Sequence, residues 1–482
     1  MTTLLDSRSF LRWCWRQLTS MRTALILLLL LGIAAIPGSI FPQRTQNPLQ
    51  VKQYFIDNQS LAPWLDRFSF FEVYSSPWFS AVYLLLFISL IGCVLPRSIE
   101  HAKAIGAKPP LTPKYLDRLD HFTEIKKIDL DLAEKYLKSK GFRIRRETNS
   151  ISAEKGYARE SGNLLFHLSL VLVLIGVGIG SLLGSRGDAI LNVGDRFINT
   201  PTSYDILGFG KFQAEDSLSP FSITVKDFQA QYDSVTNAPI DYTLTVSTAN
   251  PVGSVEDTKI IKVNKPLAYG NTKIYLQANG YSPSVIIKDK QGKVVFEGPT
   301  PFLPQDSNLS SIGAIKVPDM DPQIGFVGSF LPTADRDPVR GGFSSYPEVL
   351  DPRLLFSIWK GDLGLDSGVP QSVYRIDTSK MERIGLKALV LNESFDFGEG
   401  SITFTGWNSW VNLQIVSDPG KIYSLVGAIL AISGLLISLF TRQRRIWVKQ
   451  GRKTQIAGLS KNEIPGLDEE IKDLVKELTS ER

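Results

Sequence analysis

The sequence predicts a membrane protein with four transmembrane α-helices and a large all-β external domain between helices 3 and 4. Two observations carry this prediction. Four stretches of the 482-residue chain are almost wholly apolar, and the long segment between the last two alternates apolar and polar residues as β-strands do. The mean hydropathy of the whole chain is close to zero because these two kinds of sequence offset each other.

The four apolar stretches are residues 23–40, 78–95, 164–183 and 422–440. A helix that crosses the hydrocarbon core needs about 20 predominantly apolar residues, and each stretch is close to that length. No acidic or basic residue other than His167 interrupts them. The basic flank of the first stretch also fits a signal peptide. However, the stretch lacks an Ala-x-Ala-like cleavage site, so we expect an uncleaved span.

Basic residues near the span ends indicate the orientation of the chain. They concentrate before the first span, after the second and after the fourth, where the sequence reads TRQRRIWVKQGRK. We therefore expect cytoplasmic segments at residues 1–22, 96–163 and 441–482. The external segments are then residues 41–77 and 184–421. The net charge of +5 is explained by this asymmetry, and we expect no nucleic-acid partner.

The smaller segments outside the spans contain recognisable elements. Residues 41–77 are expected to form two short helices at the membrane surface. In residues 96–163, LDLAEKYLKSKGFRIRRE predicts a helix, a Gly141 C-cap and a strand, with ISAEKGYA as the partner strand of a small α+β element. The tail, residues 441–482, ends in an amphipathic helix, which we interpret as solvated or as docking on a partner.

The external segment at residues 184–421 predicts an all-β domain, either a sandwich or a distorted barrel. IIKDKQGKVVF predicts a hairpin within it, because a Gly-containing turn joins two apolar runs. Trp407 and Trp410 are candidates for a chaperone surface or for anchors at the membrane interface. The two cysteines, Cys14 and Cys93, both fall on the cytoplasmic side, so we expect no external thiol relay in this chain.

His167 is the candidate functional residue, because an ionisable side chain within a span is costly. It lies about four residues inside the third span, roughly 6 Å from its cytoplasmic end. Two interpretations stay open from the residues themselves. A neutral imidazole can hydrogen-bond across helices, or it can bind haem iron at the membrane boundary. A second imidazole for the same iron would then come from another chain.

The helical angle of His167 bears on its neighbours. Gly176, Gly180 and Gly184 form a stripe of small residues that favours close helix packing. Gly176 follows His167 by nine residues, which is about half a turn at ~100° per residue. We therefore expect the glycine stripe to pack within the bundle. The opposite face, which holds His167, Leu170, Val171 and Leu174, would be free for another protein, a ligand or lipid.

The chain resembles the ResB-like cytochrome c biogenesis proteins, the CcsB-type half of the System II cytochrome c synthase. The resemblance covers nearly the whole chain and rests on the order of short motifs relative to the four spans. These are PGSIFPQ (Gly38, Ser39, Pro42, Gln43), SSPWF (Trp78, Phe79), CVLPR (Cys93, Arg97), GFRIRRE, ESGNLLFH (Gly162, His167), YGNTKIYLQANGY (Tyr275, Gln277, Gly280, Tyr281), VNLQIVSDPGKIY (Leu413, Gln414, Asp418, Pro419, Gly420) and RRIWV.

The resemblance implies a role in c-type cytochrome maturation. Such proteins pair with a CcsA-type haem-handling membrane protein, move haem b across the membrane and present it to apocytochrome c for thioether attachment. His167 matches the family's span-3 histidine, a proposed haem ligand, and would hold the haem iron. The chain is then at most a non-catalytic or accessory subunit of the haem lyase. Relatives from cyanobacteria and plastids imply a thylakoid membrane with a lumenal β-domain.

Two rival interpretations remain. The chain could be a haem-free membrane scaffold or chaperone that holds apocytochrome c for a partner synthase. In that case His167→Ala would leave the haem content unchanged. A membrane-anchored hydrolase is disfavoured, because the external domain has no histidine, no cysteine and no G-x-S-x-G motif.

Overall fold

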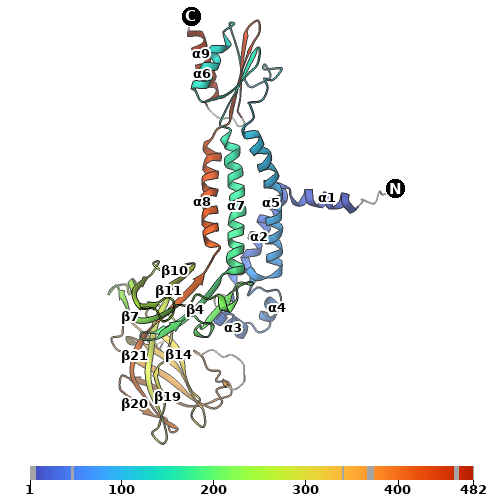
Figure 1. Ribbon diagram of the computed structural model, residues 1–482. Helices are drawn as coiled ribbons and strands as arrows, with labels where there is room; N and C mark the ends of the chain where they lie inside the picture. The colour runs from blue at the N-terminus through green and yellow to red at the C-terminus, as the bar shows by residue number, and fades with distance from the viewer. Residues whose placement is uncertain (1–6, 45–47, 339–340, 366–373, 461–465, 481–482) are drawn as a thin grey trace. The chain divides into compact units, whose positions relative to one another are not determined.

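The computed structural model describes residues 7–44, 48–338, 341–365, 374–460 and 466–480. It comprises two compact units. The first unit contains residues 1–178 and 420–482, which include most of the four long helices and a small α+β domain. The second unit, residues 179–419, is the β-rich domain between the third and fourth long helices (Figure 1).

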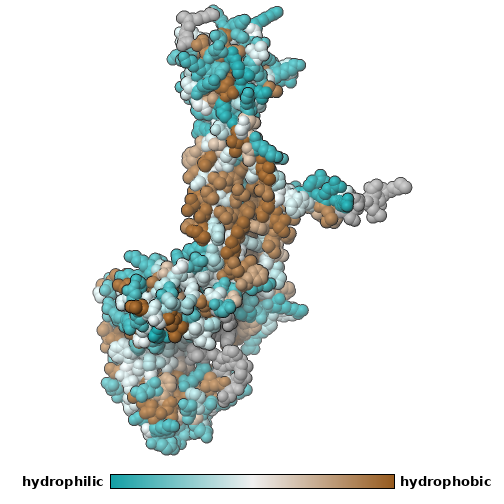
Figure 2. All heavy atoms as spheres, in the orientation of Figure 1, coloured by the Kyte–Doolittle hydropathy of each residue, from teal (hydrophilic) through white to brown (hydrophobic). Residues whose placement is uncertain are grey.

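Four helices are long and apolar enough to cross a membrane, as predicted. They are α2 (Met21–Ile40), α5 (Pro77–Ile105), α7 (Ala158–Leu183) and α8 (Lys421–Phe440). Apolar side chains cover their outer surface in Figure 2. The second and third helices extend beyond the predicted apolar ranges, to Ile105 and from Ala158. The start of α5 is fixed by Ser76, whose side chain accepts a hydrogen bond from the Phe79 backbone N–H at 3.2 Å.

Helices α7 and α8 pack closely through small residues that face each other. A Cβ atom on Gly162 would lie 2.7 Å from the Gly434 carbonyl oxygen, and one on Gly176 would lie 2.4 Å from the Ser424 hydroxyl oxygen. Gly427 meets Val173 and the Ser169 carbonyl in the same way. The predicted packing role of Gly176 is therefore confirmed. The contacting stripe on α7 runs through residues 162, 169 and 176, so the two helix backbones come near each other along much of their length.

The segment between α2 and α5 contains the two predicted short helices, α3 (Pro48–Asp57) and α4 (Ala62–Arg67), and a 3₁₀ turn at Val73–Ser75. Gln43, almost fully buried, ties this segment together. Its amide nitrogen donates to the carbonyls of Phe41 and Phe70, both at 3.0 Å. Its amide oxygen accepts from the Val73 N–H at 3.0 Å. The last residue of the PGSIFPQ motif, Gln43, thus makes three hydrogen bonds to backbone groups of this segment.

Replacing Gln43 by leucine should destabilise this segment by about 1–3 kcal/mol, because the buried Val73 N–H and two partly buried carbonyls lose their partner. Hydrogen exchange measures the effect. The Val73 amide should exchange faster in the variant, with amides of the small domain as the internal reference. Unchanged protection at Val73 would show that water or another side chain replaces Gln43.

The small domain is a five-stranded antiparallel sheet covered on one face by two helices. Its strands, in the order in which they pair, are β1 (His121–Ile125), β23 (Thr454–Ser460), β22 (Arg444–Gln450), β3 (Ser150–Lys155) and β2 (Arg143–Arg146). The predicted helix α6 (Leu130–Ser139), the Gly141 turn and the β2–β3 pairing are all present. The helix α9 (Leu467–Ser480) packs beside α6 on the same core.

The C-terminal segment differs from its prediction as a solvated or partner-docking tail. Residues 444–460 form two strands, and Arg444 pairs with Lys155, almost 300 residues earlier in the chain. The apolar side chains of α9 are buried against the sheet: Leu467, Ile471, Leu474 and Leu478 are each at most 6% exposed. Residues 444–460 and 467–480 therefore complete the domain that residues 96–163 begin.

Glu154 on β3 ties the two halves of this domain together. Its carboxylate is 5% exposed and accepts hydrogen bonds from Gln443 at 2.9 Å, Arg445 at 3.1 Å and Arg143 at 3.2 Å. Burial acts to raise the pKa of Glu154. The hydrogen bonds from Gln443 and Arg445 and the Arg445 charge outweigh that effect and hold the pKa below its usual value of 4.5.

The lowered pKa predicts an acid-sensitive domain. A carboxyl whose pKa is lower in the folded state stabilises the fold above its unfolded pKa, here near 4.5, and this stabilisation is lost as pH falls through the folded value. Glu154→Gln should cost about 1–3 kcal/mol at neutral pH. It should also flatten the dependence of the unfolding free energy on pH below about 5. An equally steep dependence in the variant would contradict this assignment.

The β-rich domain consists of two sandwiches that share one sheet, which confirms the predicted β class. The shared sheet is built around two strands of 18 residues each, β11 (Thr272–Asp289) and β21 (Gly400–Ser417), paired along their length. Its other strands are β4 (Ser185–Asn192), β6 (Ile206–Phe209), β10 (Leu267–Tyr269), β12 (Val294–Pro299) and β20 (Ser394–Asp396). The β11–β12 pair is the predicted hairpin.

One half of the shared sheet packs on a four-stranded sheet and the other half on a five-stranded sheet. The first is formed by β5 (Arg196–Ile198), β7 (Ser222–Tyr232), β8 (Pro239–Ala249) and β9 (Asp257–Lys262). The second is formed by β13 (Leu303–Pro304), β14 (Ser311–Val317), β15 (Ile324–Leu331), β18 (Arg353–Lys360) and β19 (Glu382–Val390). The remaining strands, β16 (Ala334–Asp337) and β17 (Gly341–Ser344), pair with each other.

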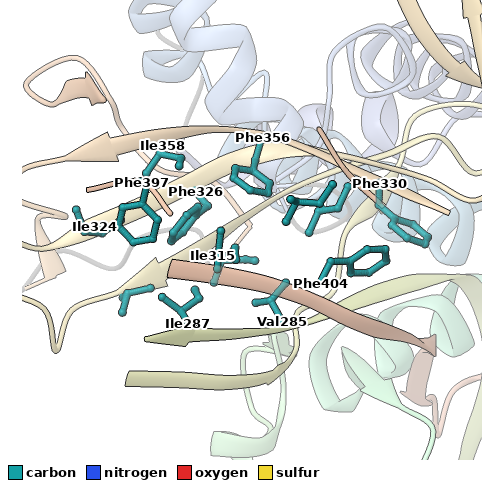
Figure 3. Close-up of a cluster of buried hydrophobic side chains, with 14 of the residues drawn as sticks. Val285, Ile287, Ile315, Ile324, Phe326, Phe330, Phe356, Ile358, Phe397 and Phe404 are labelled. Atoms are coloured by element: carbon teal, nitrogen blue, oxygen red, sulfur yellow. The ribbon is translucent and has the colours of Figure 1, made fainter. Parts of the chain in front are cut away.

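The second core is rich in aromatic side chains (Figure 3). Phe326 and Phe330 of β15 and Phe356 of β18 face Val285 and Phe404 of the two long strands, and all five are at most 3% exposed. The edge-to-face contact between Phe330 of β15 and Phe404 of β21, with ring centroids 6.2 Å apart, joins the two layers.

Trp410 was predicted as a surface or interface residue, and that prediction is wrong. Its side chain is 2% exposed and lies against Gly280, where a Cβ would come within 2.5 Å of the indole ring. The indole N–H is shared between the carbonyls of Tyr281 and Phe302, at 3.2 and 3.0 Å. Trp410 therefore links the long strands to the second core, whereas Trp407 remains partly exposed.

Candidate functional site

His167 lies in the first part of α7, and its two ring nitrogens have different surroundings. Nδ1 is 2.7 Å from the Asn163 carbonyl oxygen, one helical turn earlier. A carbonyl can only accept a hydrogen bond, so Nδ1 carries the proton and donates it. In the neutral ring Nε2 then holds a lone pair. No hydrogen bond from the described residues reaches Nε2.

This arrangement suits a metal ligand. Histidines that bind metals generally donate their other ring N–H to a carbonyl or carboxylate, which fixes the tautomer and the direction of the ring. The His167 ring is half-buried and meets the Phe166 ring edge to face, with centroids 5.2 Å apart. A neutral imidazole with a free Nε2 among apolar side chains fits the axial ligation of haem iron.

Two contacts between α5 and α7 fix the height of His167 along α5. An ion pair joins Arg97 to Glu160, with Arg97 Nε 3.1 Å from the carboxylate, and the Tyr83 hydroxyl donates to the Leu174 carbonyl. Arg97 and Tyr83 are each seven residues from Leu90, and their partners are each seven residues from His167. In two antiparallel helices this places His167 level with Leu90.

The face of α7 that holds His167, Leu170, Val171 and Leu174 was predicted to be free for other molecules. For the last three residues this prediction is wrong. Val171 is 8% exposed and packs on Leu90 and Val94 of α5. Leu170 and Leu174 join the same cluster, as does Cys93 of the CVLPR motif. Of the predicted glycine stripe, Gly176 packs within the bundle, whereas Gly180 and Gly184 lie beside Asp418 and Ser417. The stripe could not show that α5 covers the opposite face. His167 therefore lies beside α5, with its ring only partly covered.

The other two histidines have partners within the chain. His101 Nε2 lies 2.9 Å from the Ser161 hydroxyl and links α5 to α7. His121 Nδ1 lies 2.6 Å from the Asp468 carboxylate and links β1 to α9. Among the described residues, no three or more His, Cys, Asp and Glu side chains gather in a way that could hold a metal ion.

In the Tyr-Gln segment of β11, one residue packs in the core and two line a small pocket. Tyr281 donates to the Pro347 carbonyl at 3.1 Å and packs on the core, and burial raises its pKa to about 12. Gln277 is the extra residue of a β-bulge, because the pairing register with β21 shifts between Leu276 and Ala278. Tyr275 and Gln277 line a small pocket of about 290 Å³ with Tyr242 and Asn264. This segment belongs to the other unit, apart from His167.

Two features of the His167 environment were not predicted. The Asn163 carbonyl is a backbone group, and its four-residue separation from His167 is the signal that could have identified it. The Arg97–Glu160 ion pair joins two motifs that the resemblance had already marked. The sequence could not show that these charges meet, because they lie 63 residues apart.

Comparison with known proteins identifies the family of the chain. The model of the ResB-like family matches residues 21–472. A Synechococcus sp. (strain WH7803) protein named "Cytochrome c biogenesis protein CcsB" is 29% identical, over 54% of this chain and 58% of the relative's length.

Two other relatives align over nearly their whole length. They are "Cytochrome c biogenesis protein CcsB" of Prochlorococcus marinus (strain NATL2A), 25% identical over 95% of this chain and 96% of the relative, and "Cytochrome c biogenesis protein Ccs1" of Rhodomonas salina, 23% identical over 99% of both. By contrast, the chain covers little more than half the length of some relatives, such as the Synechococcus protein. Because the family model spans all four long helices and both domains, the chain belongs to the ResB-like family.

Proposed function

We propose that this protein serves in c-type cytochrome maturation, as a subunit that moves haem b across the membrane and presents it to apocytochrome c. The names of its relatives support the pathway. The observation that supports the haem assignment is the 2.7 Å contact between His167 Nδ1 and the Asn163 carbonyl oxygen. Its Nδ1–H is held by the Asn163 carbonyl, and its Nε2 lone pair is left available to haem iron.

In this proposal haem is cargo, and His167 gives it a transient site within the membrane. The Asn163 hydrogen bond keeps Nδ1 protonated and aims Nε2 away from the helix backbone. The second axial imidazole comes from another chain, a CcsA-type haem-handling membrane protein. The apocytochrome c thiols then form the thioether bonds outside, without a cysteine from the β-rich domain, since the chain's cysteines are Cys14 and Cys93.

We infer a thylakoid membrane with both termini cytoplasmic and the β-rich domain in the lumen. Basic residues lie before α2 and in its first turn, including Arg16 and Arg22, and after α8, including Arg442, Arg444 and Arg445. With this orientation His167 lies toward the cytoplasmic end of α7, where haem would enter. The relatives from cyanobacteria and plastids agree with a thylakoid location.

Deleting the gene tests the pathway. The strain should lose covalently attached haem from its c-type cytochromes while its b-type cytochromes keep theirs, because only the former need thioether attachment. Staining of denatured membrane proteins for haem makes the comparison directly. Normal c-type staining would contradict the proposed function. If the deletion abolishes staining but His167→Ala does not, the haem-free scaffold is the better account.

A further inference from the structure

The helix α1 (Ser7–Leu18) precedes the first long helix and has two distinct faces. Arg8, Arg12 and Arg16 follow one another at four-residue intervals and are all exposed. At ~100° per residue they occupy less than a quarter of the helix circumference. Phe10 and Cys14 lie on the opposite side. The helix is therefore amphipathic, with a narrow arginine face and a broad apolar face.

The apolar face of α1 has little covering within the chain. Phe10, Leu11 and Trp13 are between 49% and 65% exposed, and Trp15, which lies beside Arg8 on the helix circumference, is 56% exposed. Phe10 and Trp13 stack on each other, with ring centroids 6.1 Å apart. Four large exposed apolar side chains on a helix of 12 residues are unusual for a surface that faces water. Something apolar is therefore expected to cover this face.

The attachment of α1 to the long helices indicates what covers it. The Leu18 carbonyl accepts a hydrogen bond from the Ser89 hydroxyl of α5 at 2.5 Å. Gly92 leaves room for Thr19, because a Cβ there would come within 2.2 Å of the threonine side chain. The chain then turns at Ser20, which caps α2. Only two residues separate α1 from a membrane span, and α1 projects away from the bundle (Figure 1).

We propose that α1 is an interfacial helix that binds the anionic lipid surface of the membrane. Its arginine face contacts headgroup phosphates, and its apolar face enters the acyl-chain boundary, as in amphipathic helices with basic polar faces. Two observations favour lipid over a protein groove: the chain continues directly into a span, and all three arginines are exposed. Ser89 and Gly92 flank Leu90, the residue level with His167, so α1 marks the lipid boundary at the height of His167.

Nitroxide labelling of the full-length protein tests this inference without reference to haem. In a Cys93→Ala background the label sits on native Cys14, on the apolar face. For the matched control it sits on Ser9→Cys, near the arginine face, in a Cys14→Ser, Cys93→Ala background. The protein is reconstituted in vesicles of phosphatidylcholine, with or without phosphatidylglycerol. Oxygen reports exposure to acyl chains, and a water-soluble nickel chelate reports exposure to water.

The label at position 14 should be relaxed by oxygen more than by the chelate, and the label at position 9 should show the reverse order. The contrast should be larger with phosphatidylglycerol and should lose that dependence when Arg8, Arg12 and Arg16 become glutamine, but not when they become lysine. If the chelate relaxes both labels equally, α1 lies in water. If neither reagent reaches position 14, protein covers it. An equal difference between positions 14 and 9 in vesicles with and without phosphatidylglycerol would exclude binding to anionic lipid. Each of these three results would overturn the proposal.

Discussion

Cells that carry His167→Ala are expected to lose nearly all covalently attached haem from their c-type cytochromes, although the protein is still assembled in the membrane. Losing only the partner that orients a metal-binding histidine typically costs about 10–100-fold in affinity, and losing the ligand itself should cost at least as much. The α7–α8 contacts run through Gly162, Ser169 and Gly176, so truncating His167 should leave them in place. Haem staining of cytochromes, normalised to immunodetected protein, measures the effect.

His101→Ala is the matched control for this prediction. His101 also joins α5 and α7, through its hydrogen bond to Ser161, but its Nε2 is already engaged. It should therefore retain much of the haem staining. His167→Gly supplied with imidazole should recover part of the activity, because a free imidazole can occupy the space of the lost ring. If His101→Ala and His167→Ala fail equally, helix packing rather than ligation would explain both.

Gly162→Leu is expected to disrupt the packing of α7 on α8. A Cβ at this position would lie 2.7 Å from both the Gly434 carbonyl oxygen and the Ser438 nitrogen, which are backbone atoms that cannot rotate away. Overpacking of this kind costs about 1–3 kcal/mol, and more where the backbone must shift. The variant should show a lower midpoint of thermal unfolding and a lower yield of monodisperse protein in detergent.

Gly32→Leu provides the comparison. It places the same side chain in α2, at a position where a Cβ would meet nothing within 4 Å. Its unfolding midpoint should stay close to that of the wild type. Equal losses in the two variants would mean that leucine at any glycine of a span is harmful and that the α7–α8 contact is not special.

The five-residue separation of Gly162 and His167 turns the imidazole away from α8 and toward α5.

The four long helices and the β class were predictable because each depends on a local pattern. A run of apolar residues such as 164–183 identifies a span by itself, and strand alternation in β11 does not depend on its partner. The strands β22 and β23 were missed for the opposite reason. Their pairing with β3 and β1 joins segments about 300 residues apart, and the basic run at 442–445 was used only to infer the orientation of the chain.

The sequence identified His167 as the candidate residue, but it did not predict which helices surround it. A lone histidine in an apolar run is visible in the sequence, and Gly176 was correctly predicted to pack within the bundle. The position of α5 depends on Arg97–Glu160 and Tyr83–Leu174, pairs between distant segments that no periodicity reveals. Trp410 was misassigned because aromatic residues near a span suit an interface and a buried strand equally well.

The most direct test of the account is an absorption spectrum of the purified complex with its haem-handling partner, oxidised and reduced, for the wild type and His167→Gly. The account predicts that the wild type carries low-spin haem and that the variant loses it or changes its spectrum. Added imidazole should restore the wild-type bands, because it replaces the ring that Asn163 holds in position. Equal haem content with identical spectra in both proteins would show that His167 is not a ligand and would favour a scaffold that never touches haem.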